Sequence, residues 1–369
     1  MNFGIKIKIK PNERQEHLLR QHFGANRWLW NYFLAKRMQD YRENKKSSTY
    51  IKDAKHLTEL KQKKDWLYVS STASQQRTLK HLDDAYKRFF KGHACFPKFK
   101  SKKHDQSFTV AGTITVKENR LCFPKFSEGI KFNRELPEYD KINNVTIKKT
   151  ASGKYYAVLS VEGKKPNLSK TGKAVGIDMG LIDFAVFSNG KTVKIPKFFK
   201  KQQASLKRAQ QHLTRKKKGS KRREKQRIKV AQIHEKIANS RRHFLHDLSS
   251  WTVKNFDTIA IETLNVKGMV KNHKLSKAIH DASWSEFFRH LKYKSEWYGK
   301  NLVTVDRFFP SSKTCNHCGY VHETLPLNVR EWNCLGCGEK LDRDLNASLN
   351  ILAEATSARI SPITGMEAV

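Results

Sequence analysis

The stretch 174-AVGIDMG-180 decides the fold of the C-terminal half of this chain. Its apolar residues form a short continuous run between polar segments, a pattern typical of a strand that is buried on both faces. Asp178 comes where the run ends, and Gly176 and Gly180 would let another segment approach the backbone closely. The sequence therefore predicts a buried strand that delivers a carboxylate to the edge of a sheet.

The segments that follow extend this strand into a domain. A hairpin is expected over 181–196, with Asn189-Gly190 as a type I′ turn, and a helical region runs from about 198 to 256. Then come a buried strand in 257-DTIAIETLNV-266, an amphipathic helix over 282–300, a strand over 301–308 and a last helix from about Arg343 to Glu354. This order of elements is that of an RNase H-like domain, with a cysteine-containing segment inserted before the last helix.

The N-terminal half reads differently. The alternating 3-FGIKIKIK-10 predicts a half-buried strand, and helical patterns follow from Glu13 to about Glu43 and from Ser70 to about Gly92. Short strands separated by turn residues then occupy 107–163. We expect a small antiparallel barrel that the N-terminal strand completes, and a polar linker after it.

Three carboxylates stand where strands or helices begin or end: Asp178, Glu262 after "TIAI", and Asp344 in the first turn of the last helix. Gathered at one sheet edge, they would suit Mg²⁺, which takes hard oxygen ligands, and two such ions can drive phosphodiester hydrolysis. Each residue also has a structural interpretation, since Asp178 could form a turn, Glu262 could simply end a strand and Asp344 could favour a helix N-terminus.

Two CxxC pairs carry a more specific signal. Cys315, Cys318, Cys334 and Cys337 have the spacing of a closed tetrahedral Zn²⁺ site, whose role would be structural. The alternative is four unrelated buried thiols. Cys95 and Cys122 have no partners at ligand spacing, so we expect free thiols and a reducing compartment.

The charge of the chain points to a polyanionic partner. It has 73 Lys and Arg against 34 Asp and Glu, a net charge of +39, which favours nucleic acid over a generally soluble basic protein. The span 197–242 is densest in cations, and we expect a helical element there that grips phosphates, although a solvated charged face is the alternative. Its candidate contact residues are Lys216, Lys217, Lys218, Lys221, Arg222 and Arg223.

The sequence shows neither a signal peptide nor an apolar run long enough for a bilayer, so an intracellular protein is expected.

Together these motifs resemble a family. "GIDMG", "IAIETLNVKGM", "FFPSSKTCNHCG", "CLGCG" and "LDRDLNASLNI" occur in the order found in the TnpB proteins of bacterial insertion sequences, relatives of type V CRISPR effectors. "ANRWLWNYFL" and "FPKFKSKK" extend the resemblance towards the N-terminus. The resemblance implies an RNA-guided DNA endonuclease with Asp178, Glu262 and Asp344 as its catalytic, Mg²⁺-binding trio and Asp342 as the weaker candidate.

The resemblance also implies a layout, an α+β multidomain protein. We expect a β-barrel wedge domain over 1–10 and 105–165, interrupted by a helical recognition domain over 11–104. A linker over 166–172 leads to a RuvC-like nuclease domain of RNase H fold over 173–310 and 341–355, with a zinc ribbon inserted over 311–340 and a disordered tail over 356–369.

The implied partners are a guide RNA from the transposon end and double-stranded target DNA beside a short target-adjacent motif. Gln76, Arg77 and Lys80 are our candidates for reading that motif, since amide and cationic side chains suit base edges. A monomer in the bacterial cytoplasm, at the nucleoid, is expected. A transposase with the same fold, or an RNA-guided repressor that binds without cutting, are the alternatives.

Overall fold

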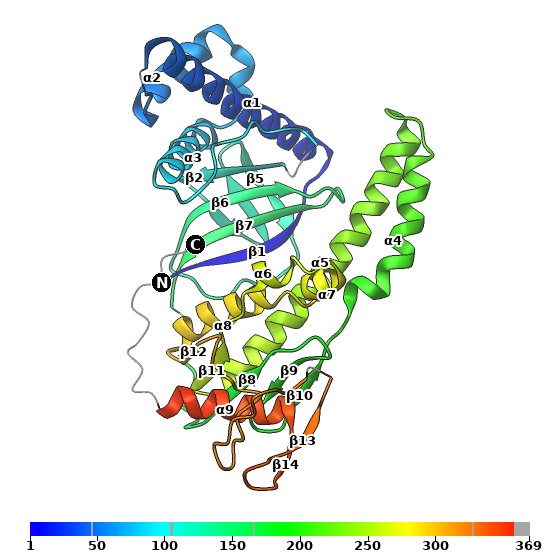
Figure 1. The fold of residues 1–369 in the computed structure, drawn as a ribbon. Coiled ribbons are helices and arrows are strands. Elements are labelled where there is room, and N and C mark those ends of the chain that lie inside the picture. The colour runs from blue at the N-terminus through cyan, green and yellow to red at the C-terminus, as the bar shows by residue number, and fades with distance from the viewer. Residues whose placement is uncertain (46, 104–105, 165–166, 327, 358–369) are drawn as a thin grey trace. The chain divides into compact units, whose positions relative to one another are not determined.

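The structure is a computed structural model, and it describes residues 1–45, 47–103, 106–164, 167–326 and 328–357. The chain divides into two compact units, with the boundary between Lys164 and Lys165 (Figure 1). Within the described residues, none of the helices combines the length and the apolar character that crossing a membrane requires. Each unit is described by itself.

The first unit contains one antiparallel sheet of seven strands in the order β2-β6-β7-β1-β5-β4-β3. Strand β1 lies inside this sheet, paired with β7 on one side and β5 on the other, and its alternating side chains Phe3, Ile5, Ile7 and Ile9 are buried. The N-terminal strand is half-buried, as the alternation predicted, and it joins the later strands. Within the described residues no pairing joins the end strands of this order, so the sheet is open and is not the closed barrel that was expected. The strands are β1 (Asn2–Lys10), β2 (Gln106–Ala111), β3 (Thr115–Lys117), β4 (Arg120–Phe123), β5 (Phe126–Phe132), β6 (Lys141–Lys149) and β7 (Tyr155–Glu162).

Helices α1 (Glu13–Asn44), α2 (Tyr50–Lys63) and α3 (Thr72–Phe90), with the 3-10 turn η1 (Asp65–Val69), complete this unit. Asn12 starts α1 with a capping box. The Asn12 side chain accepts a hydrogen bond from the Gln15 N–H, and the Gln15 side chain accepts one from the Asn12 N–H. Leu29, Phe33, Leu57, Leu79 and Leu82 form the core between the helices. Helix α2 was not predicted, because its apolar residues are sparse among lysines.

The second unit is built on a mixed sheet of order β10-β9-β8-β11-β12. Its strands are β8 (Ala174–Asp178), β9 (Asp183–Phe187), β10 (Thr192–Lys194), β11 (Thr258–Glu262) and β12 (Asn301–Val305). The β8–β9–β10 pairings are antiparallel, whereas β8–β11 and β11–β12 are parallel. The order of the strands agrees with the predicted one, but two helices between β11 and the predicted amphipathic helix, Val266–Met269 and His273–Ala282, were not predicted.

The turn between β9 and β10 differs from the predicted type I′ turn. That turn needs two successive residues with positive φ, and only Gly190 has one, at 83°. The Gly190 N–H donates to the Phe187 carbonyl, and the Phe187 N–H donates to the Lys191 carbonyl. The loop is thus one residue longer than expected, with glycine in its left-handed position.

Helices cover both faces of this second sheet. Val175, Ile177, Ile259 and Ile261 pack with residues of α5 (Lys221–Asn255) and α8 (Trp284–Tyr298) on one face. Ala260, Val303 and Val305 pack with Ile351 and Ala355 of α9 (Arg343–Ser357) on the other. The remaining helices are α4 (Phe198–Thr214), α6 (Val266–Met269) and α7 (His273–Ala282).

Three segments of the second unit differ in detail from the expected ones or add detail to them. The predicted helical region over 198–256 consists of two helices, α4 and α5, which form a helical hairpin (Figure 1). The turn between them covers 215–220, where Gly219 has φ of 85°. Helix α9 continues to Ser357, so the first two residues of the expected disordered tail are helical and the rest lies outside the described residues. The cysteine segment contributes the small ribbon β13 (Glu331–Asn333) and β14 (Lys340–Asp342).

Candidate active site and metal centre

Asp178 and Glu262 lie at the carboxyl ends of two neighbouring parallel strands. The register pairs Ile177 of β8 with Ile261 of β11, so the two acidic residues follow at the same level. Because side chains alternate along a strand, both belong to the face opposite Ile177 and Ile261, the face that α9 covers. The first two members of the predicted trio therefore come together at one sheet edge.

The third carboxylate is brought to this face by the close packing of α9 on β8. A Cβ atom on Gly176 would overlap the carbonyl oxygen of Ser348 and would lie 2.8 Å from the Leu352 backbone nitrogen. A glycine is therefore required where the helix crosses the strand. Asp344 stands in the first turn of this helix.

The two aspartates of 342-DRD-344 have different surroundings. The exposed Asp342 accepts a hydrogen bond from the Leu345 N–H (2.8 Å), which is the bond of a residue that caps the start of a helix. Asp344 forms an ion pair with Arg330, whose Nη1 lies 3.1 Å from Asp344 Oδ2. Between them, the buried Arg343 donates to the Pro326 carbonyl (2.6 Å) and ties the segment down.

The pKa of Asp178 is shifted first by burial and then by the two other carboxylates. Burial, together with the negative charges of Asp344 and Glu262, raises the pKa of Asp178 to about 7. Burial also raises the pKa of Glu262. Carboxyl groups that resist ionisation next to one another are stabilised by a cation, so the donor set fits a hard divalent metal ion such as Mg²⁺.

The four cysteines form a much tighter group. In the part of the chain that the structure describes, they are the one set of three or more possible His, Cys, Asp or Glu ligands whose atoms all lie within 4.8 Å of one another. The acidic trio is not gathered this closely. The Sγ atoms of Cys315 and Cys337 are 3.8 Å apart, and those of Cys318 and Cys334 are 3.5 Å apart. A tetrahedron with Zn–S bonds of about 2.3 Å has edges of about 3.8 Å, so the geometry fits zinc.

Each CxxC pair is held in the same kind of tight turn. The Gly319 N–H donates to the Cys315 carbonyl and the Gly338 N–H to the Cys334 carbonyl, and both glycines have positive φ. The left-handed conformation explains why glycine follows the second cysteine of each pair directly. The repeated turn presents two sulfurs from each side, as a four-sulfur site needs.

Two asparagines of α9 join the cysteine module to the sheet. The side chain of Asn346 donates to the Thr314 carbonyl (2.7 Å) and accepts from the Asn316 N–H (2.9 Å). One turn later, Asn350 donates to the carbonyls of Ser311 and Thr314. The polar residues of 341-LDRDLNASLN-350 thus cap the helix, carry Asp344 and fasten the first cysteine turn beside it.

The predicted DNA-reading residues share one surface hollow in the first unit. Gln76, Arg77 and Lys80 of α3 line a cavity of about 300 Å³ together with Tyr50 and Gly112. Gln76 and Lys80 are exposed. The structure brings these three residues together, and their role in reading DNA stays a prediction.

The predicted phosphate-gripping residues surround the tip of the α4–α5 hairpin. Lys217, Lys218, Lys221 and Arg222 are exposed, and Lys216 is half-buried. Arg223 is used differently, because its Nη1 donates to the carbonyls of Leu213 (2.6 Å) and Lys216 (2.9 Å). Its visible function is to stabilise the turn.

Arg330 was missed by the sequence reasoning. It precedes Asp344 by 14 residues and lies in a segment without motif character, so only the folded module brings the two together. A cavity lined by aromatic residues of α1 and α3 was also missed, because its residues lie far apart in the sequence.

The fold is that of an α+β protein with one antiparallel and one mixed sheet, and its site has two carboxylates at strand ends, a third in the first turn of a helix, and a four-cysteine module. Family models match residues 1–46 ("Helix-turn-helix domain"), 156–273 ("Probable transposase") and 284–351 ("Cas12f1-like, TNB domain"). A "Putative RNA-guided DNA endonuclease" of Streptomyces pristinaespiralis is 37% identical over 96% of this chain and 90% of its own length. A "Putative RNA-guided DNA endonuclease InsQ" of Escherichia coli K12 is 30% identical over 95% of this chain and 91% of its own length.

This chain belongs to the TnpB family. Its fold is similar to that of a solved "Cas12f1-sgRNA-target DNA complex", with a TM-score of 0.57 at 14% identity over 92% of this chain and 83% of the other.

Proposed function

We propose that this chain is an RNA-guided, Mg²⁺-dependent DNA endonuclease that cuts double-stranded DNA complementary to its guide, next to a short target-adjacent motif. The observation that supports the proposal is the position of Asp178 and Glu262 at the carboxyl ends of two neighbouring parallel strands, on the sheet face against which α9, with Asp344 in its first turn, packs. The names of the relatives that match nearly the whole chain supply the guided activity.

Asp178, Glu262 and Asp344 would hold two Mg²⁺ ions, and Asp342, which caps α9, would not. When bound, such ions activate a water and stabilise the leaving oxygen of a phosphodiester. Asp344 would exchange its ion pair with Arg330 for the metal, which leaves that guanidinium available to a DNA phosphate. Until the metal binds, this ion pair would offset the negative charge of Asp344.

One Zn²⁺ held by the four cysteines would be structural, since four sulfurs leave no open coordination position. Such a zinc ion would take no part in the cleavage reaction and would act only by positioning Asp344. Through the bonds of Asn346 and Asn350 to the first cysteine turn, an ordered zinc module fixes the start of the helix that carries Asp344.

For the binding of nucleic acid we propose a division of labour. The wedge domain (1–10 and 105–165) and recognition domain (11–104) hold the RNA and read the target-adjacent motif through Gln76, Arg77 and Lys80. After the linker (166–172), the RuvC-like domain (173–310 and 341–355) with its zinc ribbon (311–340) cuts, and Lys216, Lys217, Lys218, Lys221 and Arg222 bind phosphates. Base pairing supplies most of the sequence specificity, as in RNA-guided systems generally. We place the protein at the bacterial nucleoid as a monomer.

The test uses protein purified with the RNA that accompanies it. That RNA is sequenced, and a plasmid carrying the complement of its guide segment is incubated with the complex in Mg²⁺ and in EDTA. We expect linear plasmid in Mg²⁺ only. Binding without cutting in Mg²⁺ would indicate a repressor, and joining of a supplied DNA end to the plasmid would indicate a transposase, so either result rejects the proposal.

A further inference from the structure

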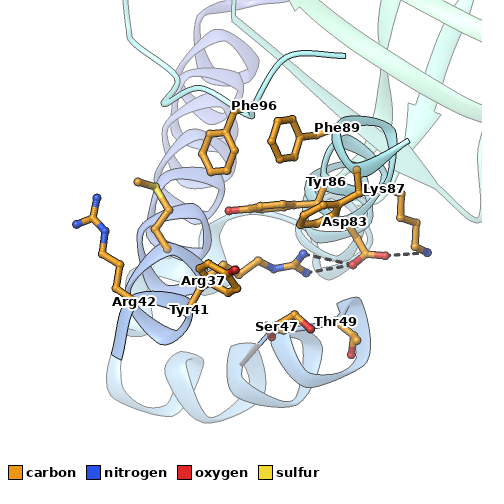
Figure 2. A pocket seen from close by; sticks show the side chains of 13 residues that line it. Arg37, Tyr41, Arg42, Ser47, Thr49, Asp83, Tyr86, Lys87, Phe89 and Phe96 are labelled. Atoms are coloured by element: carbon orange, nitrogen blue, oxygen red, sulfur yellow. Dashed lines mark hydrogen bonds and ion pairs between the residues drawn. The ribbon is translucent and has the colours of Figure 1, made fainter. Parts of the chain in front are cut away.

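The first unit contains a cavity that the proposed function does not use. It has a volume of about 520 Å³, within the range of roughly 300–1,000 Å³ that is typical of small-ligand sites. It opens between the C-terminal parts of α1 and α3 and the segment that leads into α2 (Figure 2). It is distinct from the hollow lined by Gln76, Arg77 and Lys80, with which it shares no residue.

The walls of this cavity are mostly aromatic. They include Tyr41, Tyr86, Phe89, Phe90 and Phe96, with Met38 beside them. Phe96 makes edge contacts with both Tyr86 and Phe89, at centroid distances of 5.6 and 5.3 Å, so these rings hold one another in place. Tyr41 and Phe90 are 59% and 74% exposed, which leaves large apolar faces in water beside a preformed cavity.

The floor of the cavity is polar but carries no net charge. Arg37 donates through Nε to Asp53 Oδ2 (2.7 Å) and through both Nη atoms to Asp83 Oδ1 (3.3 Å each). Lys87 also pairs with Asp83, at 2.9 Å (Figure 2). Two cations and two anions cancel, and Arg37 and Asp53 are buried, so little charge remains to attract a phosphate into the cavity.

The rim, in contrast, is basic. Arg42 is exposed at the mouth, and the Lys45 ammonium lies 5.5 Å from the centroid of the Tyr41 ring. A ligand that suits these surroundings has a flat, neutral π system for the interior and an anionic group that stays outside. A nucleotide has both parts, and aromatic platforms with adjacent cations are how proteins bind single-stranded nucleic acid.

We propose that this cavity binds an unpaired base of the guide RNA, stacked on the Tyr41 and Phe90 rings, with its phosphate at the basic rim. The inference rests on the proposed function for the identity of the RNA. RNA is favoured over an apolar peptide by charge complementarity, because Arg42 and Lys45 make the rim basic and the chain as a whole carries a net charge of +39. The neutral floor explains why the base and not the phosphate would enter.

Two matched substitutions isolate the cavity. Tyr41→Leu removes an exposed ring from the cavity, whereas Tyr68→Leu removes an equally exposed ring (54%) of the same unit that does not line it. Leucine keeps an apolar side chain but not the π face. Because both tyrosines are largely exposed, both variants should fold, which thermal melting checks.

The binding probes are a fluorescent oligoadenylate of about ten nucleotides and an abasic ribose-phosphate strand of the same length and charge. Affinity is measured by anisotropy on RNA-stripped full-length protein in EDTA, so that neither cleavage nor a correct guide is needed. We expect oligoadenylate to bind more tightly than the abasic strand. Tyr41→Leu, alone or with Phe90→Leu, should weaken oligoadenylate at least about fivefold and leave the abasic strand unchanged, while Tyr68→Leu changes neither.

Equal affinity for the two probes, or equal losses in the Tyr41 and Tyr68 variants, would overturn the proposal. If Tyr41→Leu weakens both probes to the same extent, the cavity recognises phosphate and the proposal is also wrong. These outcomes are separate from failure of the proposed function, since a protein that binds the base but never cuts DNA would satisfy this test.

Discussion

Gly176 of β8 lies directly beneath the carbonyl oxygen of Ser348 in α9, so closely that no Cβ atom fits between them. Two residues after Gly176 comes Asp178, and four residues before Ser348 comes Asp344. The crossing of this strand and helix therefore sets the separation of the two carboxylates. The backbone contact, and not any bond between the acids, positions the site.

Gly176→Ala should disrupt the site without altering any carboxylate. The new methyl group meets rigid backbone, so we expect a loss of stability on the order of 3 kcal/mol or more, together with loss of cleavage. Gly24→Ala is the matched control, because Gly24 in α1 has no atoms within 4 Å of the added Cβ and should gain roughly 0.5–1 kcal/mol. Urea unfolding of the two variants measures the difference, and a Gly176 variant as stable as wild type would refute the packing argument.

Asp344→Asn and Asp342→Asn should separate the two aspartates of the DRD sequence. We expect the first to lower the cleavage rate on the order of a thousandfold or more while guided DNA binding persists. The second should cut at the wild-type rate, since asparagine caps a helix as well as aspartate does. Gel assays of cleavage and of binding, run side by side, give both readings. Full cleavage by the Asp344 variant would mean that the wrong aspartate was assigned.

Substitution of a clustered cysteine should remove zinc from the protein, and substitution of any other cysteine should not. We expect about one zinc per chain in protein purified without chelators, and its loss in Cys334→Ser, because a structural site folds with its metal. Cys95→Ser is the control, since Cys95 is exposed and lies outside the cluster. Elemental analysis of both variants measures this directly. Wild-type protein without zinc, or a Cys334 variant that keeps it, would contradict the assignment.

The stability of the first unit should depend on pH through His22. The ring is buried between Phe108 and Phe126, and its Nε2 accepts from the Ser71 N–H while Nδ1 faces the Leu18 carbonyl. Burial lowers the pKa of His22 from 6.5 to about 4, so the folded state favours the neutral ring. Its contribution to stability is complete above pH 6.5 and is lost as the pH falls towards 4, on the order of 3 kcal/mol in all.

Urea unfolding of RNA-free protein between pH 7 and pH 5 tests this dependence. His22→Gln should remove part of the slope, while His17→Gln, at an exposed position of the same helix, should keep it. An identical slope in all three proteins would show that other groups cause the pH dependence.

Much of the second unit could be predicted because its signals are local. A few neighbouring residues are enough to predict the strand that ends in Asp178, the strand that ends in Glu262 and the paired CxxC motifs. Parallel strands then necessarily bring their carboxyl ends to one edge of the sheet. The break between α4 and α5 was hidden, because lysines and arginines favour helix on both sides of Gly219.

What could not be predicted depends on contacts between distant segments. Nothing near Arg330 indicates that it pairs with Asp344, and Arg223 looks like any other cation of its run until the turn folds around it. The aromatic cavity joins residues of α1 and α3 whose helical spacing in the sequence is equally that of core residues.

The central claim, that an RNA directs the cutting, is tested most directly by exchanging the guide. One plasmid carries two different target sites beside the same adjacent motif, and one preparation of RNA-stripped protein is loaded with either of two RNAs that differ only in their guide segment. In Mg²⁺, we predict that each RNA directs cutting to its own complement and that protein without RNA leaves the plasmid intact. Cutting at a fixed site whichever RNA is supplied, or in the absence of RNA, would contradict the account.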